Sequence, residues 1–66
     1  MGLTIEVASE DDGRWLAEVM ELSGVLAYGP TRSEAISRAQ ALALRVLADR
    51  LDHGESVPKL GQVFAV

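Results

Sequence analysis

The segment 28–35 constrains the fold most, because it separates extended sequence from helical sequence. The residues before it follow the patterns of strands, and those after it repeat with the period of a helix. Thr31 and Glu34 have the spacing of a capping box, in which the Thr31 hydroxyl accepts from the Glu34 N–H and the Glu34 carboxylate accepts from the Thr31 N–H. Pro30 has a fixed φ and disfavours helical geometry at Gly29. The sequence therefore predicts a helix that begins immediately after Thr31, where the sheet ends.

Two strands joined by an acidic turn are predicted before this junction. Residues 3–8 alternate cleanly, and residues 14–20 are apolar on both faces. Residues 9–13 between them have the composition of a turn, in which Gly13 can supply a positive φ. The pattern predicts an antiparallel hairpin.

The register of this hairpin follows from its apolar residues. Pairing Ala8 with Arg14 places six apolar side chains on one face, whereas a slip of one residue breaks that face. The predicted cross-strand pairs on this face are Val7 with Trp15, Ile5 with Ala17 and Leu3 with Val19. On the other face, the register places Glu18 opposite Thr4. It also predicts an ion pair between Arg14 and the diagonal Glu6.

A third short strand is predicted at residues 25–28, and a helix from Arg32 to about His53. At 100° per residue, the apolar side chains of the helix fall on one broad stripe. The stripe holds Ile36, Ala39, Leu42, Ala43, Val46, Leu47 and Leu51, with Leu44 at its edge. Gly54 is suited to the C′ position that ends a helix. Residues 63–66 have the pattern of a short fourth strand.

The predicted fold is α+β with the order β-β-β-α-β in one domain, residues 1–66. It combines a three-stranded antiparallel sheet, a short fourth strand and one long helix packed on one face. Because one helix covers only one face of the sheet, the other face stays exposed and is a candidate association surface. The third strand contributes to it either Leu26 and Tyr28 or Val25 and Ala27. We take Leu16, Met20, Leu26 and Tyr28 as the candidate interface.

The composition indicates a small protein with a marginal core, whose extra stability should come from tight packing or from association. The chain has 66 residues, no cysteine and a formal net charge of −4. A chain this short buries only about 60% of its unfolded surface, so we expect a homo-oligomer, a dimer or larger. The acidic balance disfavours direct nucleic-acid binding and suits a basic partner. No apolar run approaches the ~20 residues of a membrane span, and no signal-peptide pattern is present, so we expect a cytoplasmic protein without membrane contact.

Residue types that often carry chemistry have ordinary structural interpretations in this chain. His53 is the only histidine, and it lies at the predicted helix C-terminus, where an imidazole interacts favourably with the helix dipole. Clustered carboxylates bind metal ions in two-metal nucleases, but a solvated sheet face accounts for Glu6 and Glu18. The sequence contains no phosphate-binding glycine motif and no evident nucleophile with a paired base. We therefore expect a protein that is not an enzyme, with no catalytic residue, cofactor or metal.

Four segments in order resemble the HicB-like antitoxin family. They are residues 12–17 (Asp-Gly-Arg-Trp-Leu-Ala), Gly24, residues 29–35 (Gly-Pro-Thr-Arg-Ser-Glu-Ala) and residues 54–58 (Gly-Glu-Ser-Val-Pro). The resemblance covers nearly the whole chain. It implies a partial RNase H-like fold without a catalytic centre, with strand order 3-2-1-4. It also implies that the fourth strand runs parallel to the first through a right-handed crossover.

The same resemblance implies a function. HicB-like proteins neutralise a small basic HicA-like mRNA interferase by direct binding, and members commonly self-associate. This chain departs from the family at residues 20–24, where Met-Glu-Leu-Ser-Gly replaces a turn with two prolines. It also has neither the helix-turn-helix nor the ribbon-helix-helix that usually follows this domain, so we expect no operator binding by these 66 residues. The alternative is a stand-alone homo-oligomer with a structural or regulatory role and no toxin partner.

Overall fold

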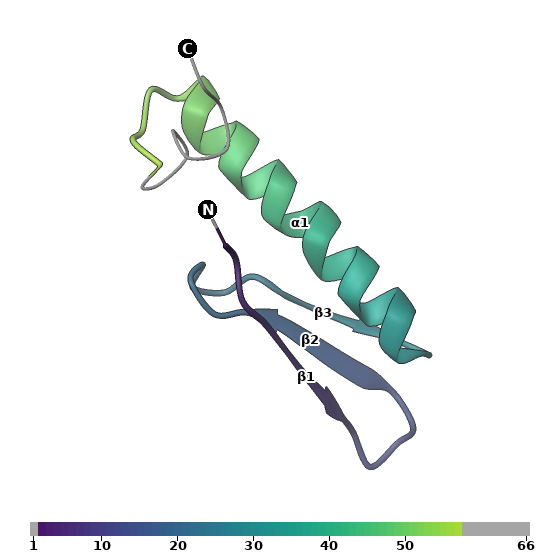
Figure 1. The fold of residues 1–66 in the computed structure, drawn as a ribbon. Helices are drawn as coiled ribbons and strands as arrows, with labels where there is room; N and C mark the ends of the chain where they lie inside the picture. The colour runs from purple at the N-terminus through teal and green to yellow at the C-terminus, as the bar shows by residue number, and fades with distance from the viewer. Residues whose placement is uncertain (1, 58–66) are drawn as a thin grey trace.

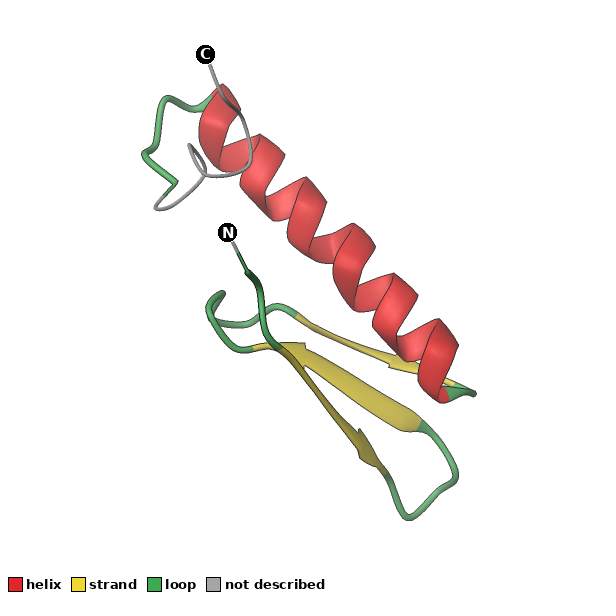
Figure 2. Cartoon of the chain, viewed as in Figure 1, coloured by secondary structure: helices red, strands yellow, loops and turns green. Residues whose placement is uncertain are grey.

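The structure, a computed structural model, describes residues 2–57 as a three-stranded antiparallel sheet with one helix. The strands are β1 (Ile5–Ser9), β2 (Trp15–Val19) and β3 (Leu26–Gly29), in the order β1-β2-β3, and the helix is α1 (Arg32–Asp52). Figure 1 shows α1 starting beside the end of β3 and running past the opposite end of the strands, and Figure 2 shows the two layers. The α+β class is confirmed. The predicted fourth strand, residues 63–66, lies outside the described residues.

A line of small side chains brings α1 close to the sheet. Ala35, Ala39 and Ala43 recur every four residues and are almost fully buried, and Leu47 continues the line. A helix with methyl groups on its inner face can lie nearer to the strands than one with larger side chains. α1 packs mainly on β3 and β2 and contacts β1 least. The inner face of β1 is therefore only partly covered.

Gly29 is required where β3 meets the helix. A Cβ atom at this position would lie 2.6 Å from the backbone nitrogen of Ala35, which is closer than real Cβ contacts come. The chain can turn from strand to helix in two residues only because no side chain separates the end of β3 from the first turn of α1. The glycine serves this close approach and does not adopt a positive φ.

The predicted hairpin register is wrong by two residues, although the assignment of side chains to the two faces is correct. Ile5 pairs with Val19 and Val7 with Ala17, so each residue of β1 has a partner two positions later than predicted. A shift of two residues preserves the faces, because side chains alternate with a period of two. The apolar pattern therefore could not distinguish the two registers.

The turn chemistry decides the register. The Gly13 N–H donates to the Glu10 carbonyl (3.1 Å), and the Glu10 N–H donates to the Arg14 carbonyl (2.7 Å). Gly13 has a φ of 86°. This is the arrangement of a three-residue hairpin loop that ends in a glycine bulge, whereas the predicted register required a five-residue loop. Residues 11–13 are the loop, and the ladder continues to Glu10.

The helix begins as predicted, with half of the capping box. Thr31 is the N-cap, and its hydroxyl accepts from the Glu34 N–H (3.1 Å). The reciprocal bond is not made between these two residues. Instead, one carboxylate oxygen of Glu34 lies 3.7 Å from Nη2 of Arg38. Thr31 alone therefore fixes the start of the helix through its side chain.

The helix ends as predicted, at Gly54. Gly54 has a φ of 75°, and its N–H donates to the carbonyl of Leu51 (3.0 Å). The Glu55 N–H donates to the carbonyl of Arg50 (2.8 Å). These two bonds form a Schellman motif, with His53 as the C-cap.

The core between sheet and helix differs from the prediction at three positions. Ala35, which precedes the predicted apolar residues of the helix, is fully buried. Leu51 is 48% exposed, because α1 has passed beyond the strands at this point (Figure 1). Leu22 lies in the predicted connection between the second and third strands, yet it is buried. Its N–H donates to the Val19 carbonyl, and the Val25 N–H donates to the Leu22 carbonyl. The tight connection folds the Leu22 side chain back into the core.

Candidate protein interface

The sheet face that points away from α1 is the candidate interface, and β2 lies at its centre. Leu16 pairs with Tyr28 on β3 and with Ala8 on β1, which forms an apolar row across the three strands. Glu18 pairs with Leu26 on β3, and Met20 follows at the end of β2. The structure therefore brings the four predicted residues onto one face. Of the two predicted alternatives for the third strand, Leu26 and Tyr28 lie on this face.

The apolar side chains of this face are accessible. Met20 is 47% exposed, and Leu26 and Tyr28 are each 39% exposed, while Leu16 at the centre is half-buried by its neighbours. Val25, on the opposite face, is only 3% exposed. Exposed large apolar side chains grouped on one face are typical of association surfaces.

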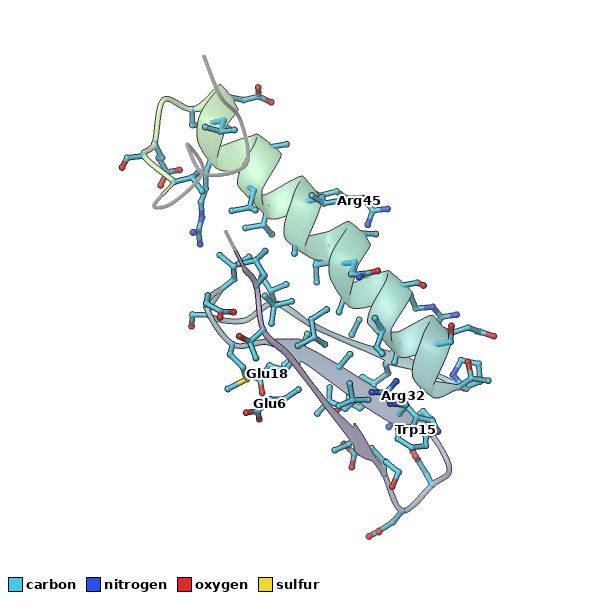
Figure 3. All side chains as sticks on the ribbon, in the orientation of Figure 1. Glu6, Trp15, Glu18, Arg32 and Arg45 are labelled. Carbon is cyan, nitrogen blue, oxygen red and sulfur yellow. The ribbon has the colours of Figure 1, made fainter. Side chains whose placement is uncertain are left out.

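Two carboxylates stand side by side on the same face. Glu6 is the cross-strand partner of Glu18, and both side chains lie on the side of the sheet away from α1 (Figure 3). Thr4, the predicted partner of Glu18, instead bonds to Met20, because its carbonyl accepts from the Met20 N–H (3.0 Å). Like charges directly opposite each other destabilise a sheet. The pair therefore lowers the stability of the free monomer and gives the face a local negative charge.

Arg14 borders the face at the hairpin end, and its predicted ion pair with Glu6 is not formed. Its guanidinium lies 4.4 Å from the centroid of the Tyr28 ring, a cation–π contact between β3 and the residue before β2. Its Nε donates to the Asp12 carboxylate (2.6 Å), and its backbone N–H donates to the other oxygen of that carboxylate (3.0 Å). The pKa of Asp12 is held below its usual range, mainly by the hydrogen bond from the Arg14 backbone N–H and next by the one from the Arg14 side chain.

His53, the histidine weighed for other chemistry, contacts the backbone at the end of α1. Nδ1 of His53 lies 2.8 Å from the Asp49 carbonyl, where a protonated nitrogen donates to one of the last carbonyls of the helix. Within residues 2–57, no group of three or more His, Asp or Glu side chains is arranged to hold a metal ion. In the same part of the chain, no polar or charged side chain is buried.

The comparisons with known proteins give no match. No family model, no curated protein and no solved structure is similar enough to this chain to be reported as a relative. Among the residues that the structure describes, no helix is both long enough and apolar enough to cross a membrane.

Sequence reasoning found the apolar members of this face but missed its charged arrangement. The pairing of Glu6 with Glu18 and the stacking of Arg14 on Tyr28 both depend on the correct register. The signal that could have found them is the turn sequence Glu-Asp-Asp-Gly-Arg. A glycine in its third loop position favours the three-residue loop over the five-residue loop.

Proposed function

We propose that this domain is a HicB-like antitoxin-type module that neutralises a small, basic, HicA-like mRNA interferase by direct binding. The outer sheet face is the binding surface in this proposal. The domain itself acts as an inhibitor by contact, with no catalytic role, no cofactor and no direct contact with nucleic acid.

One observation carries the proposal: exposed apolar side chains and a carboxylate pair share one sheet face. Met20, Leu26 and Tyr28 supply apolar area of the kind that forms the centre of an interface. Glu6 and Glu18 lie beside them and are neighbours across the strands. A basic partner relieves the repulsion between the two carboxylates and adds long-range attraction to a chain of net charge −4.

The proposal includes the finer fold features that the family resemblance implies. We infer that residues 63–66 form a fourth strand beside β1, parallel to it, which gives the strand order 3-2-1-4. Within the described residues β1 pairs only with β2, so its other edge is available to a further strand. The partial cover of the inner face of β1 by α1 supports the same position.

A stand-alone homo-oligomer without a toxin partner is the second candidate function. Exposed apolar area in so small a chain also favours self-association. Twofold packing of two outer faces, however, brings four glutamates near one another, two from each copy. This charge arrangement favours a basic partner over a second copy at this face.

The test is co-expression with the product of a short basic reading frame that adjoins the gene. We expect the two proteins to co-purify and the growth defect caused by the basic protein alone to disappear. Leu26→Lys should abolish both effects, because it replaces an exposed apolar side chain of the face with a cation. Leu44→Lys, the same change on the exposed side of α1, is the matched control and should retain both.

Two results would count against the proposal. A neighbouring basic protein that does not bind the purified domain contradicts the toxin-neutralising function. The lack of any such reading frame near the gene favours the stand-alone homo-oligomer. Charge dependence is a further check, since Glu6→Lys should weaken a complex with a basic partner more than Glu34→Lys, a change on the helix.

A further inference from the structure

A second apolar surface runs along the solvent side of α1. Four apolar side chains and one serine lie on it at intervals of four, three, four and three residues: Ser37, Ala41, Leu44, Ala48 and Leu51. This is the heptad spacing of a coiled-coil seam. We call these five residues the helix stripe; it extends over about 21 Å at 1.5 Å per residue.

The helix stripe is not used by the core of the domain. The buried line of α1 consists of Ala35, Ala39, Ala43 and Leu47, and it lies about 140° around the helix from the stripe. Leu44 is 67% exposed and Leu51 is 48% exposed, which makes Leu44 the most exposed large apolar side chain of the described residues. The C-terminal part of the stripe lies where α1 has passed beyond the strands (Figure 1).

The stripe is complementary to itself when two helices pack antiparallel. In the register that places Leu44 level with Ala48 of a second copy, Ala41 is level with Leu51 of that copy. The twofold axis repeats both layers, so each of four layers combines one leucine with one alanine. Large against small side chains allow close helix packing without voids. A parallel pair would instead place leucine against leucine and alanine against alanine, with uneven spacing.

The charges beside the stripe agree with this direction. Arg38 and Asp52 flank the same side of the stripe, and antiparallel packing brings each close to the level of the other in the second copy. Within its own chain, Nη1 of Arg38 also donates to the Tyr28 carbonyl (2.9 Å). The two copies of Arg45 approach each other near the axis, where solvent and salt screen their repulsion. The helix dipoles also oppose each other in this arrangement. The outer sheet face, in contrast, brings only glutamates together when it packs on itself.

We propose that the helix stripe binds a second copy of this chain, as an antiparallel helix–helix homodimer. The two helices form the centre of the dimer, and the two outer sheet faces point away from each other and remain accessible. The dimer therefore offers two equivalent binding faces. This inference does not rest on the proposed function, because it involves a different surface and its partner is a second copy of this chain.

The test is the molar mass of the full chain by light scattering, at concentrations from roughly 0.1 to 1 mM, since a small interface binds weakly. We expect the wild type to approach twice the chain mass of 7.1 kDa at the higher concentrations. Leu44→Lys should remain at the monomer mass, because lysine replaces the central leucine while keeping a similar helix propensity. Met20→Lys is the matched control on the outer face and should dimerise like the wild type.

Two outcomes of the light-scattering experiment would overturn the proposed dimer. A wild type that stays monomeric up to 1 mM excludes the dimer, and dissociation by Met20→Lys but not by Leu44→Lys places self-association on the outer face. Circular dichroism of each variant separates dissociation from unfolding. Loss of dimerisation with an unchanged spectrum supports the proposal, and Ala48→Gln provides a second stripe variant if Leu44→Lys unfolds.

Disulfide formation tests the direction of the helices, because the chain contains no cysteine. In the antiparallel register, a mixture of Leu44→Cys chains and Ala48→Cys chains should cross-link between the two variants. Each variant alone should cross-link much less, since equal positions lie several residues apart along the axis and a disulfide needs Cα atoms within about 7 Å. Preferential cross-linking of each variant with itself would contradict the antiparallel arrangement.

Discussion

The two faces of the sheet are made by the same three strands, yet they differ in what covers them. On the inner face, Ala17, Val19 and Val25 are almost fully buried under α1. On the outer face, Met20, Leu26 and Tyr28 have exposed fractions of 39–47% although they are equally apolar. Adjacent residues in one short segment, Val25 and Leu26, therefore have opposite environments.

The apolar side chains of the strands therefore have two separate causes in this chain. The inner side chains are apolar because the fold needs a core. The outer ones lie beside Glu6 and Glu18, a pair that lowers stability, so stability of the monomer does not explain that face. The binding function proposed above accounts for both its apolar and its acidic residues.

The largest expected effect comes from the same substitution at two adjacent positions. Val25→Lys places an unpaired charge in the core and should destabilise the domain by more than about 4 kcal/mol, enough to unfold it. Leu26→Lys should change the free energy of unfolding by less than about 1 kcal/mol, since its side chain reaches solvent beside Glu18. Urea denaturation measures both. Similar losses at the two positions would contradict the distinction between the faces.

Gly29→Ala should destabilise by roughly 1–3 kcal/mol, a cost typical of overpacking. The added Cβ meets the backbone of Ala35, which cannot move without shifting α1 away from the inner face. Gly2→Ala is the control, because no atom lies within 4 Å of the added group there. Equal denaturation midpoints for the two variants would show that the strand–helix junction is looser than described.

Thr31→Ala should destabilise by roughly 0.5–2 kcal/mol through loss of the N-cap hydrogen bond to Glu34. The change weakens the start of α1 and with it the cover of the inner face. Ser33→Ala, two residues later in the same turn, removes a hydroxyl that has no capping role. Thermal unfolding should therefore separate the two variants, and a Thr31 variant as stable as the Ser33 variant would contradict the capping function.

Glu18→Gln should increase stability by about 0.2–1 kcal/mol, because it removes one of two like charges that face each other across the strands. The gain should shrink at high salt, where the repulsion is screened. Glu10→Gln, at the hairpin end, is a suitable control. A loss of stability on Glu18→Gln would mean that the outer face does not carry an unfavourable charge pair.

The smallest expected effect concerns acid pH. Hydrogen bonds from Arg14 lower the pKa of Asp12 in the folded state, so this carboxylate stabilises the hairpin above the usual aspartate pKa of about 3.9. The contribution is lost as the pH falls below that value and through the lowered pKa. Asp12→Asn should therefore reduce the dependence of stability on pH between about 5 and 2. An unchanged profile would contradict a lowered pKa.

The local features of the fold were determined by the sequence alone. Thr31 predicts the helix start and Gly54 its end, because capping depends on residues within one turn of the chain. The separation of the two sheet faces also follows from the alternation of side chains. These features need no information about distant residues.

The hairpin register differed by two residues because the apolar pattern has a period of two and cannot resolve such a shift; the local turn at residues 10–14 decides it. Other features depended on the tertiary structure. The burial of Leu22 and the exposure of Leu51 depend on where the connection folds back and where α1 leaves the sheet. The choice of Leu26 and Tyr28 for the outer face required the pairing of β3 with β2. Each of these results depends on contacts between segments far apart in the chain, which a local pattern does not specify.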